Sequence, residues 1–486
     1  MKMLRNGLLA LLAVVVLLAV VVGVRAATWT APTWEAEVAL APRVAVDGVA
    51  AAERLAQAVR FRTVSNQDPA ANDWSQWEGF HAWLQATYPR AHAAMRRETV
   101  AGRTLVYTWP GSEPSRAPIV LMAHQDVVPA SPEAGWTHPP FAGVVDKGVV
   151  WGRGALDDKG SLVAIMEAAE ALAASGFRPK RTIYLVFGHD EETGGTGAKA
   201  AAALLASRGV KPEFVLDEGG LALTEDPLTG KPMAMIAVAE KGFATLRVVA
   251  RGEGGHSSMP PDETAVQTLA KAVDRIASDR FDVRLEGPGA DTLRTIAGRG
   301  DGVTRALMAN EWLFGGLIAG RLGGEPSAAS VLRTSIAPTM LTGSPKENVL
   351  ADRAVALINY RIHPRDSLEG VMARAKRAVK GLKVELSWVE GAAGTSTVAP
   401  TRTPTWYMLA ALAREATGAQ PMPGLLAGAT DSRAMTGLTP NVYRFLPVKV
   451  TSQELESFHG VNERLSVENL DRAAEFYARL MATAAG

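Results

Sequence analysis

The chain contains no cysteine among its 486 residues. This absence excludes disulfide bonds, thiolate metal ligands and a cysteine nucleophile, so any metal ion must be held by nitrogen and oxygen atoms. The sequence also lacks an excess of charge of either sign, because 51 Lys and Arg residues stand against 50 Asp and Glu residues. A near-neutral chain gives no electrostatic reason to expect nucleic acid or an acidic surface as partner. We therefore expect no nucleic-acid partner.

The first 27 residues have the pattern of an export or anchoring segment. Lys2 and Arg5 precede an apolar run of 17 residues from Leu8 to Val24. This run is longer than the ~7–15 residues of a cleavable signal core and reaches the lower end of the ~17–25 residues of a spanning helix. The small residues that follow also permit cleavage, so the segment is either an uncleaved membrane anchor, our prediction, or a signal peptide of a secreted protein. Positive charge before the run places the rest outside the cytoplasm, in a periplasmic or extracellular space.

The rest of the chain is long enough for two domains, one of them discontinuous. Residues 28–46, rich in Ala, Pro and Trp, predict a linker. Over residues 47–240, short apolar runs alternate with alanine-rich stretches, which predicts an α/β domain on a mostly parallel sheet. Residues 241–394 predict a ferredoxin-like α/β sandwich inserted into that domain, with strands and helices in the order strand, helix, strand, strand, helix, strand. The first pattern resumes over residues 395–486 and closes the first domain.

An extra segment of the insertion, at about residues 285–332, contains the apolar stretch WLFGGLIAGRL. This stretch predicts either a core helix or dimer contact, or the lining of an apolar acyl site. The sequence does not decide between these two interpretations.

Polar side chains follow the predicted strands of the first domain, at the points where these strands end. They are His124, Asp157, the pair Glu191 and Glu192, and Asp217. In open α/β sheets, ligands bind at the carboxyl ends of the strands. Carboxylates gathered at one rim repel one another unless a cation neutralises them, so the pattern predicts a metal site. Imidazole mixed with carboxylate favours Zn²⁺ or a similar first-row ion over Ca²⁺ or Mg²⁺.

Two metal ions fit this rim as well as one, because an aspartate can bridge two ions through its two oxygens. Paired ions ~3.5–4 Å apart share a hydroxide and polarise a substrate carbonyl in aminopeptidases. A general base is then needed to take the proton of the water, and Glu191 is placed for this beside Glu192.

Seven stretches of the sequence resemble motifs of the di-zinc amidohydrolases and exopeptidases, a family that includes aminoacylase, carboxypeptidase S, acetylornithine deacetylase and succinyl-diaminopimelate desuccinylase. They are AHQDVVP, WGRGALDDKG, GHDEETGG, VLDEGG, GGHSSMPP, GATDSR and FHGVNE. Together with the intervening pattern, the resemblance covers nearly everything after the linker. The sequence looks most like the carboxypeptidase S branch, which also contains enzymes that act on fatty-acyl amino acids.

The resemblance implies a set of ligands for two Zn²⁺ ions per subunit, replaceable by Co²⁺ or Mn²⁺. One ion would be held by His124 and Asp217, and the other by Glu192 and His459. Asp157 would bridge the two ions.

The resemblance also implies roles for residues that do not bind metal. Glu191 would be the general base and later the proton donor to the leaving amine. Asp126 would accept a hydrogen bond from the ring of His124 and fix its tautomer. His256 would donate to the oxyanion, often from a partner subunit, which predicts a homodimer through the inserted lid domain. Candidates for holding the substrate carboxylate or the oxyanion are Arg361, Asn348, Arg433 and Gly428, with a solvent-facing Arg433 as the alternative.

The predicted activity is zinc-dependent hydrolysis of an amide bond next to a free amino-acid carboxylate, in a small peptide or an N-acyl amino acid. The enzyme would then be a carboxypeptidase or an N-acyl-amino-acid hydrolase of aminoacylase type. One alternative is a dipeptidase or aminopeptidase of the same fold, which favours acidic groups around a substrate ammonium. Another is a non-catalytic, membrane-tethered binding protein, which predicts the loss of a ligand or of the base. All five ligand positions and Glu191 are present.

Overall fold

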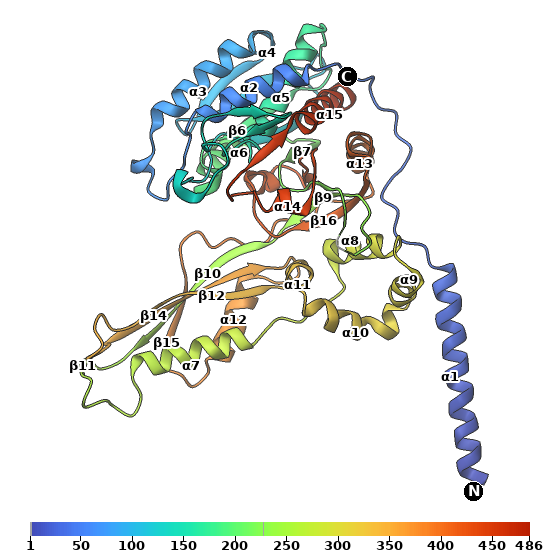
Figure 1. Cartoon of the computed structure of the whole chain (residues 1–486), viewed down its shortest axis with the longest axis vertical. Coiled ribbons are helices and arrows are strands. Elements are labelled where there is room, and N and C mark those ends of the chain that lie inside the picture. The colour runs from blue at the N-terminus through green and yellow to red at the C-terminus, as the bar shows by residue number, and fades with distance from the viewer. Residues whose placement is uncertain (1, 227) are drawn as a thin grey trace. The chain divides into compact units, whose positions relative to one another are not determined.

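The computed structural model describes residues 2–226 and 228–486, and Figure 1 shows the order of its helices and strands. The described residues form two compact units. The large unit consists of Trp34–Glu225, Lys231–Glu240 and Ser396–Gly486. The small unit consists of Met1–Thr33, Asp226–Gly230 and Lys241–Thr395.

The large unit is built on a mixed sheet whose strands lie in the order β1-β2-β6-β3-β7-β17-β9-β8-β18, with β16 beside β9. The neighbours β6, β3, β7 and β17 are parallel. Antiparallel pairs join β1 to β2, β2 to β6 and β9 to β17. The expected mostly parallel sheet therefore describes the centre and not the whole. Between β1 and β2 the chain is too short for a crossover helix, so these two strands form a hairpin.

The strands of this sheet are β1 Arg96–Val100, β2 Thr104–Trp109, β3 Ile119–His124, β6 Ile183–Gly188, β7 Phe214–Asp217, β8 Ala222–Leu223, β9 Met233–Glu240, β16 Gln420–Leu426, β17 Val442–Arg444 and β18 Lys449–Val450. A second, three-stranded sheet contains β4 Val144–Asp146, β5 Val149–Trp151 and β19 Arg464–Ser466.

Buried side chains cover both faces of the central strands. Successive side chains of a strand point to opposite faces, and every residue of β3 is buried. Val120 and Met122 of β3 pack in a cluster with Ala201 and Leu205 of α6. The helices α2, α5 and α15 pack against one another (Figure 1). The helices of this unit are α2 Gly48–Arg60, α3 Trp74–Thr87, α4 Pro89–Ala94, α5 Lys159–Ala174, α6 Thr196–Ser207, α13 Pro404–Thr417, α14 Ser452–Leu455 and α15 Val467–Ala485.

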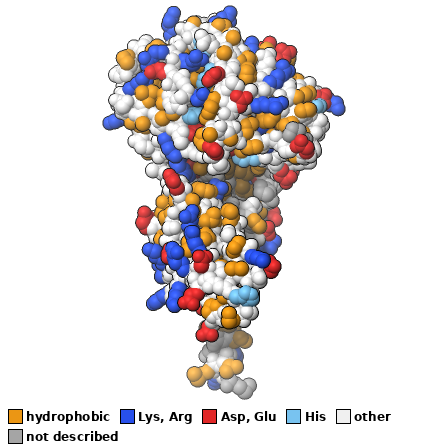
Figure 2. Space-filling view, turned by 90° about the vertical axis from the view of Figure 1, so that its left-hand side faces the viewer, with side chains coloured by type: hydrophobic (Ala, Val, Ile, Leu, Met, Phe, Trp, Pro, Cys, Tyr) orange, Lys and Arg blue, Asp and Glu red, His pale blue; other side chains and the backbone are white. Residues whose placement is uncertain are grey.

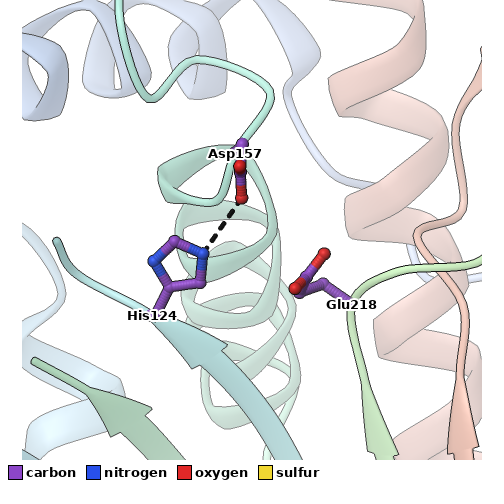
Figure 3. Close-up of side chains that lie close together, drawn as sticks. All are labelled: His124, Asp157 and Glu218. Atoms are coloured by element: carbon purple, nitrogen blue, oxygen red, sulfur yellow. Dashed lines mark hydrogen bonds and ion pairs between the residues drawn. The ribbon is translucent and has the colours of Figure 1, made fainter. Parts of the chain in front are cut away.

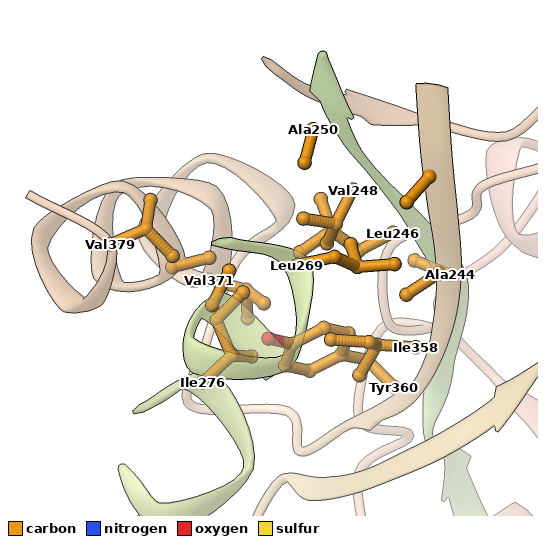
Figure 4. Close-up of a cluster of buried hydrophobic side chains, with 14 of the residues drawn as sticks. Ala244, Leu246, Val248, Ala250, Leu269, Ile276, Ile358, Tyr360, Val371 and Val379 are labelled. Carbon is orange, nitrogen blue, oxygen red and sulfur yellow. The ribbon is translucent and has the colours of Figure 1, made fainter. Parts of the chain in front are cut away.

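The small unit contains an antiparallel sheet in the order β12-β14-β10-β15. In chain order its elements are β10 Gly242–Arg251, α7 Ala265–Ser278, β12 Ser335–Thr342, β14 Arg353–Ile362, α12 Leu368–Ala378 and β15 Val384–Trp388, which is the β-α-β-β-α-β order of ferredoxin-like folds. Alternate residues of β14 are buried. Figure 4 shows Ile358 and Tyr360 packed with Leu269 of α7 and Val371 of α12. The short strands β11 Gly255–His256 and β13 Val349–Leu350 pair with each other.

The extra segment of the small unit forms four helices, α8 Gly287–Ala297, α9 Gly302–Ala309, α10 Glu311–Gly323 and α11 Pro326–Leu332. They enclose a small core of their own around Ala297, Met308 and Ile318. The amino-terminal helix α1 Lys2–Thr28 is the one described helix that is long and apolar enough to cross a membrane. None of its described residues is buried.

Acidic and basic side chains are interspersed on the face that Figure 2 draws. On this face they form no large area of a single sign, in keeping with the near-neutral composition.

Candidate metal centre

His124 is the last residue of the buried strand β3 and has both ring nitrogens engaged. Its Nε2 lies 3.0 Å from Oδ1 of Asp157. Its Nδ1 lies 3.0 Å from the backbone oxygen of Asp126 and 3.4 Å from Oδ1 of the same residue. Asp126 therefore orients the ring from behind, as a metal-binding histidine requires. The backbone oxygen, which lies closer than the carboxylate, contributes to this orientation.

Asp157 lies between two histidines in the loop before α5. Its Oδ1 faces His124, and its Oδ2 lies 2.7 Å from Nε2 of His459. The same Nε2 lies 3.2 Å from Oε2 of Glu192. Asp157 thus contributes one oxygen toward each side, which is the geometry of a bridging ligand.

Two groups of side chains have their potential ligand atoms within 4.8 Å of one another, and Asp157 belongs to both. The first group is His124, Asp157 and Glu218, and Figure 3 shows its side chains facing one another. The second group is Asp157, Glu192 and His459. The structure therefore brings together four of the five residues that the sequence analysis proposed as ligands.

The fifth proposed ligand, Asp217, belongs to neither of these two groups of described residues, whereas its neighbour Glu218 belongs to the first. Oδ2 of Asp217 accepts a hydrogen bond of 2.7 Å from the backbone N–H of Ser432, and Oδ1 accepts one of 3.0 Å from Glu218. The stretch VLDEGG contains both acids, and sequence reasoning had no way to decide between them.

Asp126 also holds the loop that carries the two glutamates. Its Oδ1 accepts a hydrogen bond of 3.1 Å from the backbone N–H of Glu191, and its Oδ2 accepts one of 3.1 Å from Glu192. The hydroxyl of Ser65 donates to Oδ2 at 2.6 Å. Sequence reasoning missed this second role, because Asp126 and Glu191 are 65 positions apart and no local pattern signals their contact.

Burial and crowding shift the pKa values of the site. Burial raises the pKa of Glu191 well above its ordinary value, with nearby carboxylates adding to the shift and His124 opposing it. Burial and the neighbouring acids, Asp157 among them, also raise the pKa of Glu218 well above its ordinary value. Hydrogen bonds to Asp157 and Glu192 raise the pKa of His459 to about 10. The raised pKa values mean that this site binds protons, and a cation that binds here would displace them.

These residues fit a pair of cations. Oε1 of Glu192 is buried and has no hydrogen-bond partner among the described residues. A bare buried carboxylate oxygen is costly unless a cation or a proton meets it. Because the ligand atoms are imidazole nitrogens and carboxylate oxygens, the donor set suits Zn²⁺.

The proposed oxyanion donor His256 and two of the four proposed substrate-binding residues, Asn348 and Arg361, lie in the small unit. His256 is exposed on β11, and its Nδ1 lies 2.8 Å from the hydroxyl of Ser258. The backbone oxygen of Asn348 accepts a hydrogen bond from Ser257, so His256 and Asn348 lie close together. Arg361 belongs to β14, and its guanidinium lies 4.8 Å from the ring centroid of Phe243.

The other two proposed substrate-binding residues lie in the large unit. Nε of Arg433 donates to Oε2 of Glu240 at 3.0 Å, and Oε1 of Glu240 also accepts a hydrogen bond from Arg444 at 2.7 Å. Arg433 is therefore held by an ion pair within the protein and does not extend freely into solvent. Gly428 lies in a bend after β16, next to Ala427.

Two groups of histidine and carboxylate that share an aspartate resemble the paired-metal sites of hydrolases such as phosphatases and aminopeptidases. The chain matches the sequence profile of Peptidase family M20/M25/M40 over residues 120–483. It belongs to this family and is a hydrolytic enzyme.

Curated relatives and solved structures agree with this assignment. The chain is 34% identical over 440 residues to the probable carboxypeptidase S-like 2 of Dictyostelium discoideum, covering 88% of this chain and 84% of the relative. It is 35% identical over 446 residues to the human N-fatty-acyl-amino acid synthase/hydrolase PM20D1, covering 90% and 88%. The crystal structure of an M20 family metallo-carboxypeptidase from Sulfolobus solfataricus shares the fold, with a TM-score of 0.67, 17% identity, and coverage of 89% of this chain and 98% of that one.

Proposed function

We propose that this enzyme hydrolyses an amide bond next to a free amino-acid carboxylate, with two Zn²⁺ ions bound at the rim of the large sheet. The observation that carries the proposal is the sharing of Asp157 by the two groups of potential ligands. One ion would be held by His124, Asp157 and Glu218, and the other by Asp157, Glu192 and His459. When bound, the ions supply Lewis-acid activation of the substrate carbonyl and of water.

Glu191 acts as the general base in this proposal. It neighbours the ligand Glu192, and its backbone is fixed by Asp126. A raised pKa allows its carboxyl group to keep the proton taken from water and then give it to the leaving amine. His256, assisted by Asn348, donates a hydrogen bond to the developing oxyanion, in this subunit or in a partner.

Glu218 replaces Asp217 in the proposed ligand set, and a matched pair of substitutions tests this change. Glu218→Gln is expected to lower bound zinc by one equivalent per chain, because it weakens the ligand that faces His124. Asp217→Asn is expected to keep both equivalents and to lower the melting temperature, because the hydrogen bond from Ser432 is weakened. Zinc analysis after dialysis and thermal unfolding measure the two effects. Loss of zinc in Asp217→Asn together with its retention in Glu218→Gln contradicts the replacement.

The free carboxylate of the substrate is recognised by an arginine. Arg361 and Arg433 are both candidates, because a guanidinium group can bind a carboxylate through two parallel hydrogen bonds. The relatives named carboxypeptidase S and N-fatty-acyl-amino acid synthase/hydrolase support a substrate that ends in a free amino acid. The acyl side is either a blocked peptide or an N-acyl group.

A hydrolysis panel tests the proposed reaction. The full chain, purified in detergent and loaded with Zn²⁺, is given N-acetyl, N-long-acyl and N-blocked dipeptide substrates of several amino acids. We expect turnover of substrates with a free carboxylate and little or none of the same compounds as carboxyl amides, since the amide removes the charge that an arginine recognises. Preference for free dipeptides with an unblocked amine identifies a dipeptidase or aminopeptidase instead. A zinc-loaded protein that hydrolyses none of these compounds contradicts the proposed reaction.

The helix α1 is proposed as an uncleaved membrane anchor with the enzyme outside the cytoplasm. Lys2 and Arg5 before the apolar run support this orientation. The sheet of the small unit is proposed as a lid and as the place where two subunits meet.

A further inference from the structure

The helix α10 exposes an apolar surface that the proposed reaction does not use. Trp312 is 56% exposed, Leu313 is 39% exposed and Leu317 is 67% exposed. Phe314 and Ile318, on the same helix, pack into the core of the extra segment. The helix is therefore apolar on its inner side and on much of its outer side, a pattern typical of a helix whose outer side contacts a partner or a membrane.

An apolar hollow adjoins this surface. Its volume is about 350 Å³, and Leu317 belongs to its lining. The other lining side chains are mostly aliphatic, among them Leu228, Leu293, Leu307 and Leu322. An open hollow of this composition gains free energy when hydrocarbon fills it.

The covering material is indicated by the contact between α1 and the start of α10. The side-chain amide of Asn310, directly before α10, donates to the backbone oxygen of Val22 at 3.2 Å. Nε of Arg25 donates to the backbone oxygen of Ala309 at 3.2 Å. Val22 belongs to the last turn of the apolar run that ends at Val24. The start of α10 is therefore held at the level where the proposed membrane anchor leaves the hydrocarbon.

The length of the anchor also indicates that the start of α10 lies near the edge of the hydrocarbon core. At ~1.5 Å per residue, the run from Leu8 to Val24 spans roughly 25 Å, which is shorter than the ~30 Å hydrocarbon core of a bilayer. A short anchor draws its flanking segments toward the bilayer. In Figure 1, the axis of α10 runs across the axis of α1, and α10 lies nearer to the amino terminus than α8 does. Tryptophan is enriched at the membrane interface, and Trp312 lies in the first turn of α10.

We infer that α10 is a second membrane contact, which lies in the interface of the bilayer that α1 crosses. Trp312, Leu313 and Leu317 insert among the lipid headgroups and upper acyl chains, and lipid hydrocarbon covers the adjoining hollow. This inference rests on the proposed anchor. Its consequence is that the small unit is fixed to the membrane at two places, so that its sheet cannot rotate freely about α1.

The absence of cysteine makes a site-specific test direct, because a single introduced cysteine carries the only label. Leu317→Cys, Leu17→Cys in the middle of α1 and Val49→Cys on α2 are each labelled with an environment-sensitive fluorophore. All three side chains are exposed. The full-length variants are reconstituted into phosphatidylcholine and phosphatidylglycerol vesicles that contain lipids with a nitroxide either near the headgroup or near the chain end. Quenching of each label is measured.

We expect the label at position 317 to be quenched most by the nitroxide near the headgroup, the label at 17 by the nitroxide near the chain end, and the label at 49 by neither. Quenching at 17 without quenching at 317 overturns the second contact and leaves the anchor intact. No quenching at 17 overturns the anchor and the second contact with it. Cross-linking between two copies through position 317, with no quenching there, assigns the surface to a second copy of the chain and also overturns the inference.

Discussion

Glu191→Gln is expected to lower kcat for amide hydrolysis by roughly 10²–10⁴-fold, the usual contribution of a general base, and to leave bound zinc unchanged. Glutamine keeps the size of the side chain but cannot take a proton from water. The backbone N–H of residue 191 still donates to Asp126, so the loop and the ligand Glu192 stay in place. Steady-state rates on the best substrate of the panel, together with zinc analysis, measure both parts of the result.

Glu53→Gln is the matched control for this substitution. Glu53 is exposed on α2, and its replacement makes the same chemical change away from the metal centre. Its kcat is expected to equal that of the unmodified enzyme. A kcat for Glu191→Gln close to that of this control shows that another group takes the proton.

Asp157→Ala is expected to remove both zinc ions and all measurable turnover. Asp157 belongs to both groups of potential ligands, so its loss opens both sites at once. Glu192→Ala affects only the group that contains His459, and it is expected to retain about one equivalent of zinc per chain. Zinc stoichiometry after dialysis separates the two outcomes, and circular dichroism checks that each variant is folded.

Equal zinc loss in these two variants argues against a bridging role for Asp157. Full zinc in Asp157→Ala contradicts its role as a ligand altogether. Added zinc provides a further check, because an alanine cannot bind metal and activity should not return at any zinc concentration that the enzyme tolerates.

Much of the fold was predictable because its signals are local. The alternation of apolar runs with alanine-rich stretches indicated a mixed α/β fold, and the structure has strands and helices in both units. The direction of each strand in the large sheet was less predictable. Pairing such as that of β9 with β17 joins segments about 200 residues apart, and no local pattern specifies it.

In the candidate site, too, local motifs predicted some residues, whereas long-range contacts were not predictable. The positions of His124, Asp157, Glu192 and His459 followed from motifs, and the structure brings these side chains together. The stretch VLDEGG offers both Asp217 and Glu218. The structure has Glu218 in the first group, and Asp217 accepts a hydrogen bond from Ser432 of a distant loop, a contact that no local pattern specifies. Arg433 was a candidate on its residue type alone, because its partner Glu240 lies 193 positions away in the sequence.

The carboxylate of Asp126 limits how the activity of this enzyme can change. The two oxygens of Asp126 accept hydrogen bonds from the backbones of the proposed base Glu191 and the proposed ligand Glu192, and the backbone oxygen of Asp126 contacts the ring of His124. Metal affinity and proton transfer are therefore mechanically linked through a single side chain. A substitution that shifts Asp126 disturbs both functions together, whereas substitutions in the small unit can alter substrate choice without that penalty. New specificities are thus expected to arise in the small unit, with the rim of the large sheet left unchanged.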